Sequence, residues 1–113
     1  MAAFNGQRWM LADMAVNLDA ARLLIYRAVQ NASLCLPSVF ESSVAKCYAN
    51  EIVRSVCQNG VQVMGGYGFA KSYGMEKRLR DSFGWGIAGG TIDVQKTNIA
   101  AAMIGSSFNQ RAR

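Results

Sequence analysis

The feature that most constrains this chain is the stretch from residue 7 to residue 59, which has no glycine and a single proline, Pro37. Apolar side chains recur in it every three or four residues, the spacing that places them on one face of an α-helix. The pattern predicts one helix over about 7–31 and a second over about 38–59, with Pro37 at the start of the second. We expect Asn59 and Gly60 to end or kink that second helix, and we expect an all-α fold.

The first predicted helix is apolar on almost every face. Its main stripe consists of Leu11, Met14, Ala15, Leu18, Ala21, Ile25, Ala28 and Val29, and further apolar side chains lie at Trp9, Met10, Val16, Leu23 and Leu24. A helix of this kind is typical of the centre of a bundle, with neighbours on several sides. We therefore expect it to be the central helix, with one neighbour supplied by a partner chain or by a segment outside this sequence. Asp19 and Arg22 should pair on its polar edge.

The segment from residue 61 to residue 90 differs in composition, since it holds eight of the eleven glycines. Glycine at this density indicates tight turns, or a close approach of the backbone to a ligand. We expect a long ordered loop that contains only a short helical turn over about 75–82. A last helix over about 92–106 should begin with Thr91 as its N-cap and carry Asp93 in its first turn.

The composition excludes several classes of function. The chain has no histidine, which removes the usual general base, the common nucleophile pairs and most zinc sites. Its net charge of +5 comes from scattered Lys and Arg residues, so we expect small phosphate-bearing ligands and no nucleic acid. Cys35, Cys47 and Cys57 fit no metal or disulfide spacing, and we expect buried free thiols.

We also expect a cytoplasmic protein. No apolar run approaches the roughly 18 residues that a membrane span needs. The first residues lack the basic start and apolar core of a signal peptide.

Several segments, in this order, resemble the C-terminal helical domain of the acyl-CoA dehydrogenases. They are Leu11-Ala-Asp-Met-Ala15, Leu18-Asp-Ala-Ala-Arg22, Ala45-Lys46, Val61-Gln-Val-Met-Gly-Gly-Tyr-Gly-Phe69, Glu76-Lys77, Arg80-Asp81 and Gly90-Thr-Ile-Asp-Val-Gln95. The resemblance covers roughly residues 7–104 and implies an up-and-down helical bundle, completed by dimerisation. It implies that residues 1–113 form one partial domain of this type, without the N-terminal and middle domains of the family.

The resemblance also implies FAD as cofactor and acyl-CoA as substrate. The residues that it assigns to FAD of the neighbouring subunit are Gln62, Val63, Met64, Gly65 and Gly66. Those that it assigns to FAD at the start of the last helix are Thr91, Ile92 and Asp93. Gly90 would lie beside the acyl-CoA thioester. Glycines allow this close approach, and a helix N-terminus offers N–H donors to phosphate or ribose oxygens.

One position departs from the family pattern and lacks the side chain that most members use as the catalytic base. Most members carry a glutamate immediately before this Gly-Thr pair, where it abstracts the α-proton of the substrate as hydride leaves for the flavin. Here the position is Gly89, which has no side chain to act as a base. A subset that resembles isovaleryl-CoA and long-chain dehydrogenases carries the base on a preceding helix, outside this sequence. We do not expect another glutamate to replace this base. Glu51 should pair with Arg54, and Glu76 lies among basic residues. No catalytic residue is therefore assigned.

Three functions stay open at this point. In the first, the chain supplies FAD-binding and dimerisation contacts for flavin-dependent α,β-dehydrogenation of an acyl-CoA, and is inactive when isolated. In the second, it is a standalone homodimeric nucleotide-binding or protein-interaction module without catalysis. In the third, it is the small subunit of a split dehydrogenase and binds a larger subunit. We expect a homo-oligomer, a dimer or higher, because the first helix has more apolar surface than this chain alone can cover.

Overall fold

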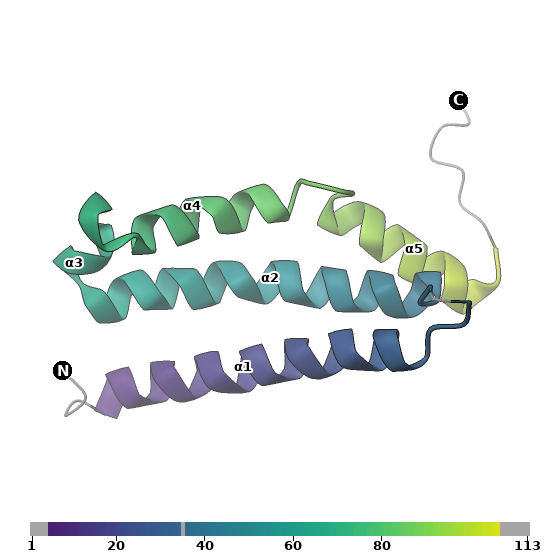
Figure 1. Cartoon of the computed structure of the whole chain (residues 1–113), viewed down its shortest axis with the longest axis horizontal. Helices are drawn as coiled ribbons and strands as arrows, with labels where there is room; N and C mark the ends of the chain where they lie inside the picture. The colour runs from purple at the N-terminus through teal and green to yellow at the C-terminus, as the bar shows by residue number, and fades with distance from the viewer. Residues whose placement is uncertain (1–4, 35, 107–113) are drawn as a thin grey trace.

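A computed structural model describes residues 5–34 and 36–106, and in this part of the chain every regular element is a helix (Figure 1). The four longer helices are α1 (Asn5–Gln30), α2 (Val39–Met64), α4 (Met75–Trp85) and α5 (Ile92–Ile104). The short helix α3 (Gly66–Phe69) and the 3₁₀ turn η1 (Lys71–Tyr73) connect α2 to α4. The predicted all-α, up-and-down bundle is confirmed. None of the described helices is long and apolar enough to cross a membrane.

The helices are arranged around α2 (Figure 1). α1 packs antiparallel along one side of α2, while α4 and α5 follow one another along the other side. α2 also contacts α3, whereas α1 packs against no helix other than α2 in the described part of the chain. The prediction that the first helix is central was therefore wrong, and the second helix has that place.

The reason lies in the size of the buried side chains. Among the described residues the buried side chains are mostly small: Ala21, Ala28, Ser43, Ala45, Cys47, Cys57, Ser82 and Gln95. Four of these belong to α2, so neighbours can approach it closely on two sides, whereas α1 buries only Ala21 and Ala28. Met10, Met14 and Leu24 of α1 are half-buried, and large apolar side chains such as Trp9, Val16 and Leu23 are exposed. Cys47 and Cys57 are buried free thiols as predicted, and Cys35 lies outside the described residues.

α2 begins where the sequence predicts and ends later. Ser38 caps it by accepting a hydrogen bond from the Glu41 backbone N–H at 3.1 Å, and its hydroxyl donates to the Glu41 carboxylate at 3.3 Å. The helix then runs through Gly60 to Met64, so it does not end at Asn59 or Gly60. A Cβ atom at Gly60 would lie 2.8 Å from Cε of Met75. The glycine thus lets α4 begin close to α2, and this packing outweighs its weak helix propensity.

The glycine-rich segment is more helical than predicted. The expected turn over 75–82 is the three-turn helix α4, and α3 and η1 precede it. The last helix begins as predicted, because the Thr91 hydroxyl accepts a hydrogen bond from the Val94 N–H at 3.4 Å and Asp93 lies in the first turn. It ends at Ile104, before Gly105 with φ +72°, two residues earlier than expected. The sequence also predicts a frayed tail over 109–113, which lies outside the described residues.

Polar contacts join the helices across their packed faces. The Tyr48 hydroxyl donates to Asn17 Oδ1 at 3.1 Å and so connects α2 to α1. The predicted pair of Asp19 and Arg22 is present at 4.0 Å. Glu51 does not pair with Arg54 as predicted. It accepts from Lys96 of α5 at 2.5 Å instead, and this hydrogen bond raises the pKa of Lys96.

Candidate cofactor site

The first predicted FAD segment, residues 62–66, lies where α2 ends. Gly65 has φ +58°, a conformation that disfavours side chains, and its N–H donates to the Gln62 carbonyl at 3.3 Å. The chain then turns into α3, whose Gly68 is buried against α2. A Cβ atom at Gly68 would lie 2.7 Å from the Val61 carbonyl oxygen, so only glycine permits this approach. Both glycines therefore have local structural reasons, and the resulting corner exposes the Gln62 side chain.

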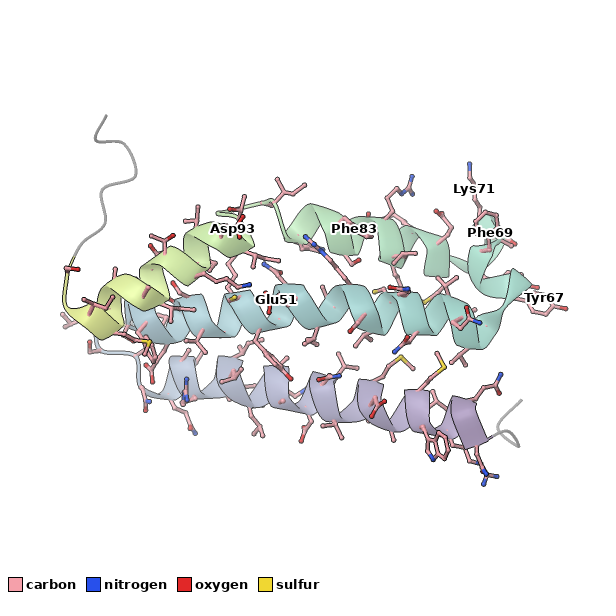
Figure 2. All side chains as sticks on the ribbon, turned by 180° about the vertical axis from the view of Figure 1, so that it is seen from behind. Glu51, Tyr67, Phe69, Lys71, Phe83 and Asp93 are labelled. Carbon is pink, nitrogen blue, oxygen red and sulfur yellow. The ribbon has the colours of Figure 1, made fainter. Side chains whose placement is uncertain are left out.

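An apolar recess lies beside this corner. It has a volume of about 330 Å³ and is lined by Val63, Met64, Tyr67 and Tyr73. The rings of Tyr67 and Tyr73 meet edge to face, with centroids 5.0 Å apart. Figure 2 shows Tyr67 and Phe69 at this end of the bundle, away from the α1–α2 interface. The recess offers apolar and aromatic surface of the kind that receives the planar ring of a nucleotide.

The second predicted segment follows the linker between α4 and α5. Gly89 has φ +66° and Gly90 has φ +97°, so two consecutive residues lie in the region that only glycine adopts readily. The Lys46 ammonium of α2 donates to the Ala88 carbonyl at 2.8 Å and to the Gly89 carbonyl. The buried Gln95 side chain donates to the Gly90 carbonyl at 3.4 Å. Three successive carbonyls are thus bound by side chains of α2 and α5.

The start of α5 has the features of an anion-binding helix terminus. Thr91 and Asp93 are exposed, and Ile92 is half-buried between them. The first-turn amides and the helix dipole favour negative charge here, although Asp93 supplies part of that charge itself. Figure 2 shows Asp93 on α5 and Glu51 on the α2 ribbon that faces it. The structure places all three predicted residues at one helix start.

The structure does not bring the two predicted FAD segments together within one chain. Gln62 follows Lys46 by sixteen positions on the continuous helix α2, a rise of about 24 Å at about 1.5 Å per residue. Lys46 contacts the linker before Thr91, so the two segments lie at opposite ends of this stretch of α2. Figure 1 shows the same separation, with α4 between them. A cofactor at one segment would leave the other free for a second cofactor.

Neither Glu51 nor Glu76 is free to replace the missing base at Gly89. Of the two glutamates considered, Glu51 pairs with Lys96 and Glu76 pairs with Arg80 at 3.7 Å. The described residues also contain no group of histidine, cysteine, aspartate or glutamate side chains that could hold a metal ion. Proton abstraction by a side chain at residue 89 is therefore not available to this chain.

Sequence reasoning missed the residues that hold the linker. From the sequence, Lys46 was singled out only within the Ala45-Lys46 match to the family pattern, and Arg54 was expected to pair with Glu51. The Arg54 guanidinium lies over the Phe83 ring, 5.1 Å from its centroid, and against the backbone of Gly86. No local spacing rule connects a helix residue to a carbonyl more than forty positions away. The Ala45-Lys46 match to the family pattern was the only available signal.

Comparisons with known proteins agree with this architecture. The family model described as "Acyl-CoA dehydrogenase, C-terminal domain" matches residues 1–104. The chain is 35% identical to a 3-sulfinopropanoyl-CoA desulfinase of Paraburkholderia xenovorans, over 98% of this chain and 28% of that protein. It is 38% identical to a short-chain specific acyl-CoA dehydrogenase of Clostridium acetobutylicum, over 86% of this chain and 26% of that protein.

A solved structure shows the same fold. It is described as the electron transferring flavoprotein of Acidaminococcus fermentans, and it matches with a TM-score of 0.86 and 31% identity over 91% of this chain and 27% of that chain. The chain thus spans little more than a quarter of the length of these relatives. The match of the family model over nearly the whole chain shows that this protein belongs to the acyl-CoA dehydrogenase family of oxidoreductases, whose C-terminal helical domain it contains.

Proposed function

We propose that this chain binds FAD between two subunits and so supplies the cofactor and dimerisation contacts of an acyl-CoA-transforming flavoprotein. One FAD would contact residues 62–66 of one chain and Thr91, Ile92 and Asp93 of the other. Gly90 would lie beside the thioester of the acyl-CoA. FAD, when bound, supplies the hydride acceptor for α,β-dehydrogenation.

The observation that carries this proposal is the spacing of the two segments. Both have the features that a dinucleotide needs, namely an apolar recess in one case and a helix N-terminus in the other. The two segments of one chain are about 24 Å apart along α2, so one half of the FAD molecule cannot contact both of them within one subunit. A two-fold arrangement of two chains offers each segment a partner from the other chain, and closed two-fold dimers are the commonest oligomers.

The proposal is tested by an FAD titration of the purified chain and two variants. Gln62→Ala should weaken FAD binding at least about tenfold, because it removes an exposed amide from the corner after α2. The matched control is Gln58→Ala, which removes an exposed glutamine one turn earlier on the same helix. Equal affinities for the two variants, or a wild-type chain that does not bind FAD, would contradict the proposal.

We further propose that the chain alone does not oxidise an acyl-CoA. Gly89 offers no base, and the chain corresponds to little more than a quarter of each relative. Mixing the FAD-loaded chain with butanoyl-CoA should leave the visible flavin spectrum in its oxidised form. Bleaching of the flavin would show turnover and would refute this statement.

A second candidate function is favoured by Gly89 together with the relatives named 3-sulfinopropanoyl-CoA desulfinase. The complete protein would then remove a sulfinate group, a reaction that need not use a carboxylate at this position. The distinguishing measurement is made on the complete protein that contains this chain. Release of sulfite from 3-sulfinopropanoyl-CoA without bleaching of the flavin would favour desulfination, whereas bleaching of the flavin by butanoyl-CoA would favour dehydrogenation.

A further inference from the structure

We infer that Lys46 is a positioning residue, which sets the orientation of the Gly89–Gly90 peptides and so directs the start of α5 toward the ligand. The inference rests on the proposed function, since it concerns how the FAD segment at Thr91 is held. Lys46 lies on α2, away from both predicted FAD segments in the sequence. Its ammonium reaches the linker between α4 and α5 and donates to two adjacent carbonyls, those of Ala88 and Gly89.

Gly89 lies directly against the Lys46 ammonium. A Cβ atom at Gly89 would lie 3.0 Å from the Lys46 Nζ, in addition to the strain of a side chain at φ +66°. The stem of Lys46 lines a shallow groove with apolar residues of α1 and α2, among them Ile25 and Ala49. Lys46 is half-buried, so part of its stem is shielded from solvent while its ammonium contacts the linker.

The hydrogen bonds fix the direction of the peptide groups. In a trans peptide the N–H points opposite to the C=O. With the carbonyls of Ala88 and Gly89 bound by Lys46 and that of Gly90 bound by Gln95, the amides of Gly89, Gly90 and Thr91 point away from these side chains. Among the described residues the amides of Gly89 and Thr91 donate no backbone hydrogen bond, whereas the Gly90 amide closes the turn over residues 86–89. Lys46 thus orients two of the three peptides at the entrance to α5, and Gln95 orients the third.

Arg54 is the second basic residue near this linker, and it makes different contacts from Lys46. Arg54 packs over Phe83 and against Gly86, at the end of α4, and donates to none of the three carbonyls. Loss of Arg54 would loosen α4, whereas loss of Lys46 would free the peptides that lead into α5. A charged donor that binds two carbonyls contributes more than a neutral one, so the effect should be measurable at this turn.

The experiment compares Lys46→Met with Lys46→Arg and with Lys77→Met in the intact chain. Met preserves the length of the stem without the donors, and Arg preserves the charge and the donors. Lys77 is the matched control, because its ammonium pairs with Asp81 within α4 at 2.5 Å and does not contact the linker. Amide hydrogen exchange is followed at the protected amides that flank the turn, Ile87, Ala88, Val94 and Gln95, and FAD affinity is measured by titration.

For Lys46→Met we expect exchange at these four amides to rise about tenfold, with α1 and the first half of α2 unchanged, and FAD to bind at least about tenfold more weakly. Lys46→Arg should retain most of both properties, and Lys77→Met should match the wild type. The inference is overturned if Lys46→Met behaves like the control, or if Lys46→Arg loses as much as Lys46→Met. A wild-type chain that does not bind FAD would refute the proposed function, and the exchange data would then decide the role of Lys46 alone.

Discussion

At the scale of single residues, Gly89 is a structural glycine as well as a missing base. Its φ of +66° and the nearby Lys46 ammonium both disfavour a side chain. Gly89→Ala should therefore lower the free energy of unfolding by about 1–2 kcal/mol. Gly84→Ala is the control, because it is helical and a Cβ atom there meets nothing within 4 Å, so it should be neutral or slightly stabilising. Urea unfolding of both variants measures the difference, and equal stabilities would contradict this role.

The two buried thiols give stability a defined pH dependence. Burial raises the pKa of Cys47 and that of Cys57 above the ordinary value of 9.0, with Glu51 as a second cause at Cys47. Because the folded-state pKa is raised, the unfolded chain releases these protons first as the pH rises. Stability is thus fully present below about pH 9 and falls above it. In the Cys47→Ala/Cys57→Ala double variant the loss of stability between pH 8.5 and 10 should be smaller, and an unchanged loss in urea titrations would refute this.

At the scale of the elements, the two glycines that pack against neighbouring helices near the end of α2 should differ in their tolerance of a side chain. At Gly68 a Cβ atom would meet backbone atoms of Val61 and the Cβ of Met64, which cannot move independently. At Gly60 it would meet the flexible end of Met75. Gly68→Ala should therefore destabilise the chain by at least about 2 kcal/mol, and Gly60→Ala by less than about 1 kcal/mol. Thermal unfolding followed by circular dichroism distinguishes the two, and a reversed order would show that the corner is not tightly packed.

Some features of the helices could be predicted from the sequence, and others could not. The start of α2 at Ser38 and the start of α5 at Thr91 were predictable, because capping depends on side chains within three residues of the helix start. The continuation of α2 through Gly60 was not, because it depends on Met75 of another helix. The central position of α2 was missed for the same reason, since apolar periodicity reports how much surface a helix can bury and not which neighbour buries it. The FAD segments came from family resemblance, whereas Lys46 required the three-dimensional contact with Ala88 and Gly89.

At the scale of the whole molecule, α1 presents an apolar face that the described residues of its own chain leave exposed. Trp9, Val16 and Leu23 lie seven residues apart on one side of α1 and are 69%, 68% and 61% exposed. Because this surface is regular and continuous, we expect it to contribute to self-association. Val16→Lys should weaken the dimer at least about tenfold, whereas Gln30→Lys, an exposed change on the same helix, should not. Sedimentation at several concentrations measures this, and equal association of both variants would show that α1 lies outside the interface.

The central claim is that one FAD is held by residues 62–66 of one chain and by the start of α5 of another. The most direct measurement mixes two defective chains, Gln62→Ala and Thr91→Val, under conditions that exchange subunits, and titrates the mixture with FAD. Mixed dimers would contain one site with both defects and one site with neither, so we predict tight FAD binding that neither variant shows alone. If the mixture binds FAD no better than its components, the site is not shared between subunits, and the account is wrong.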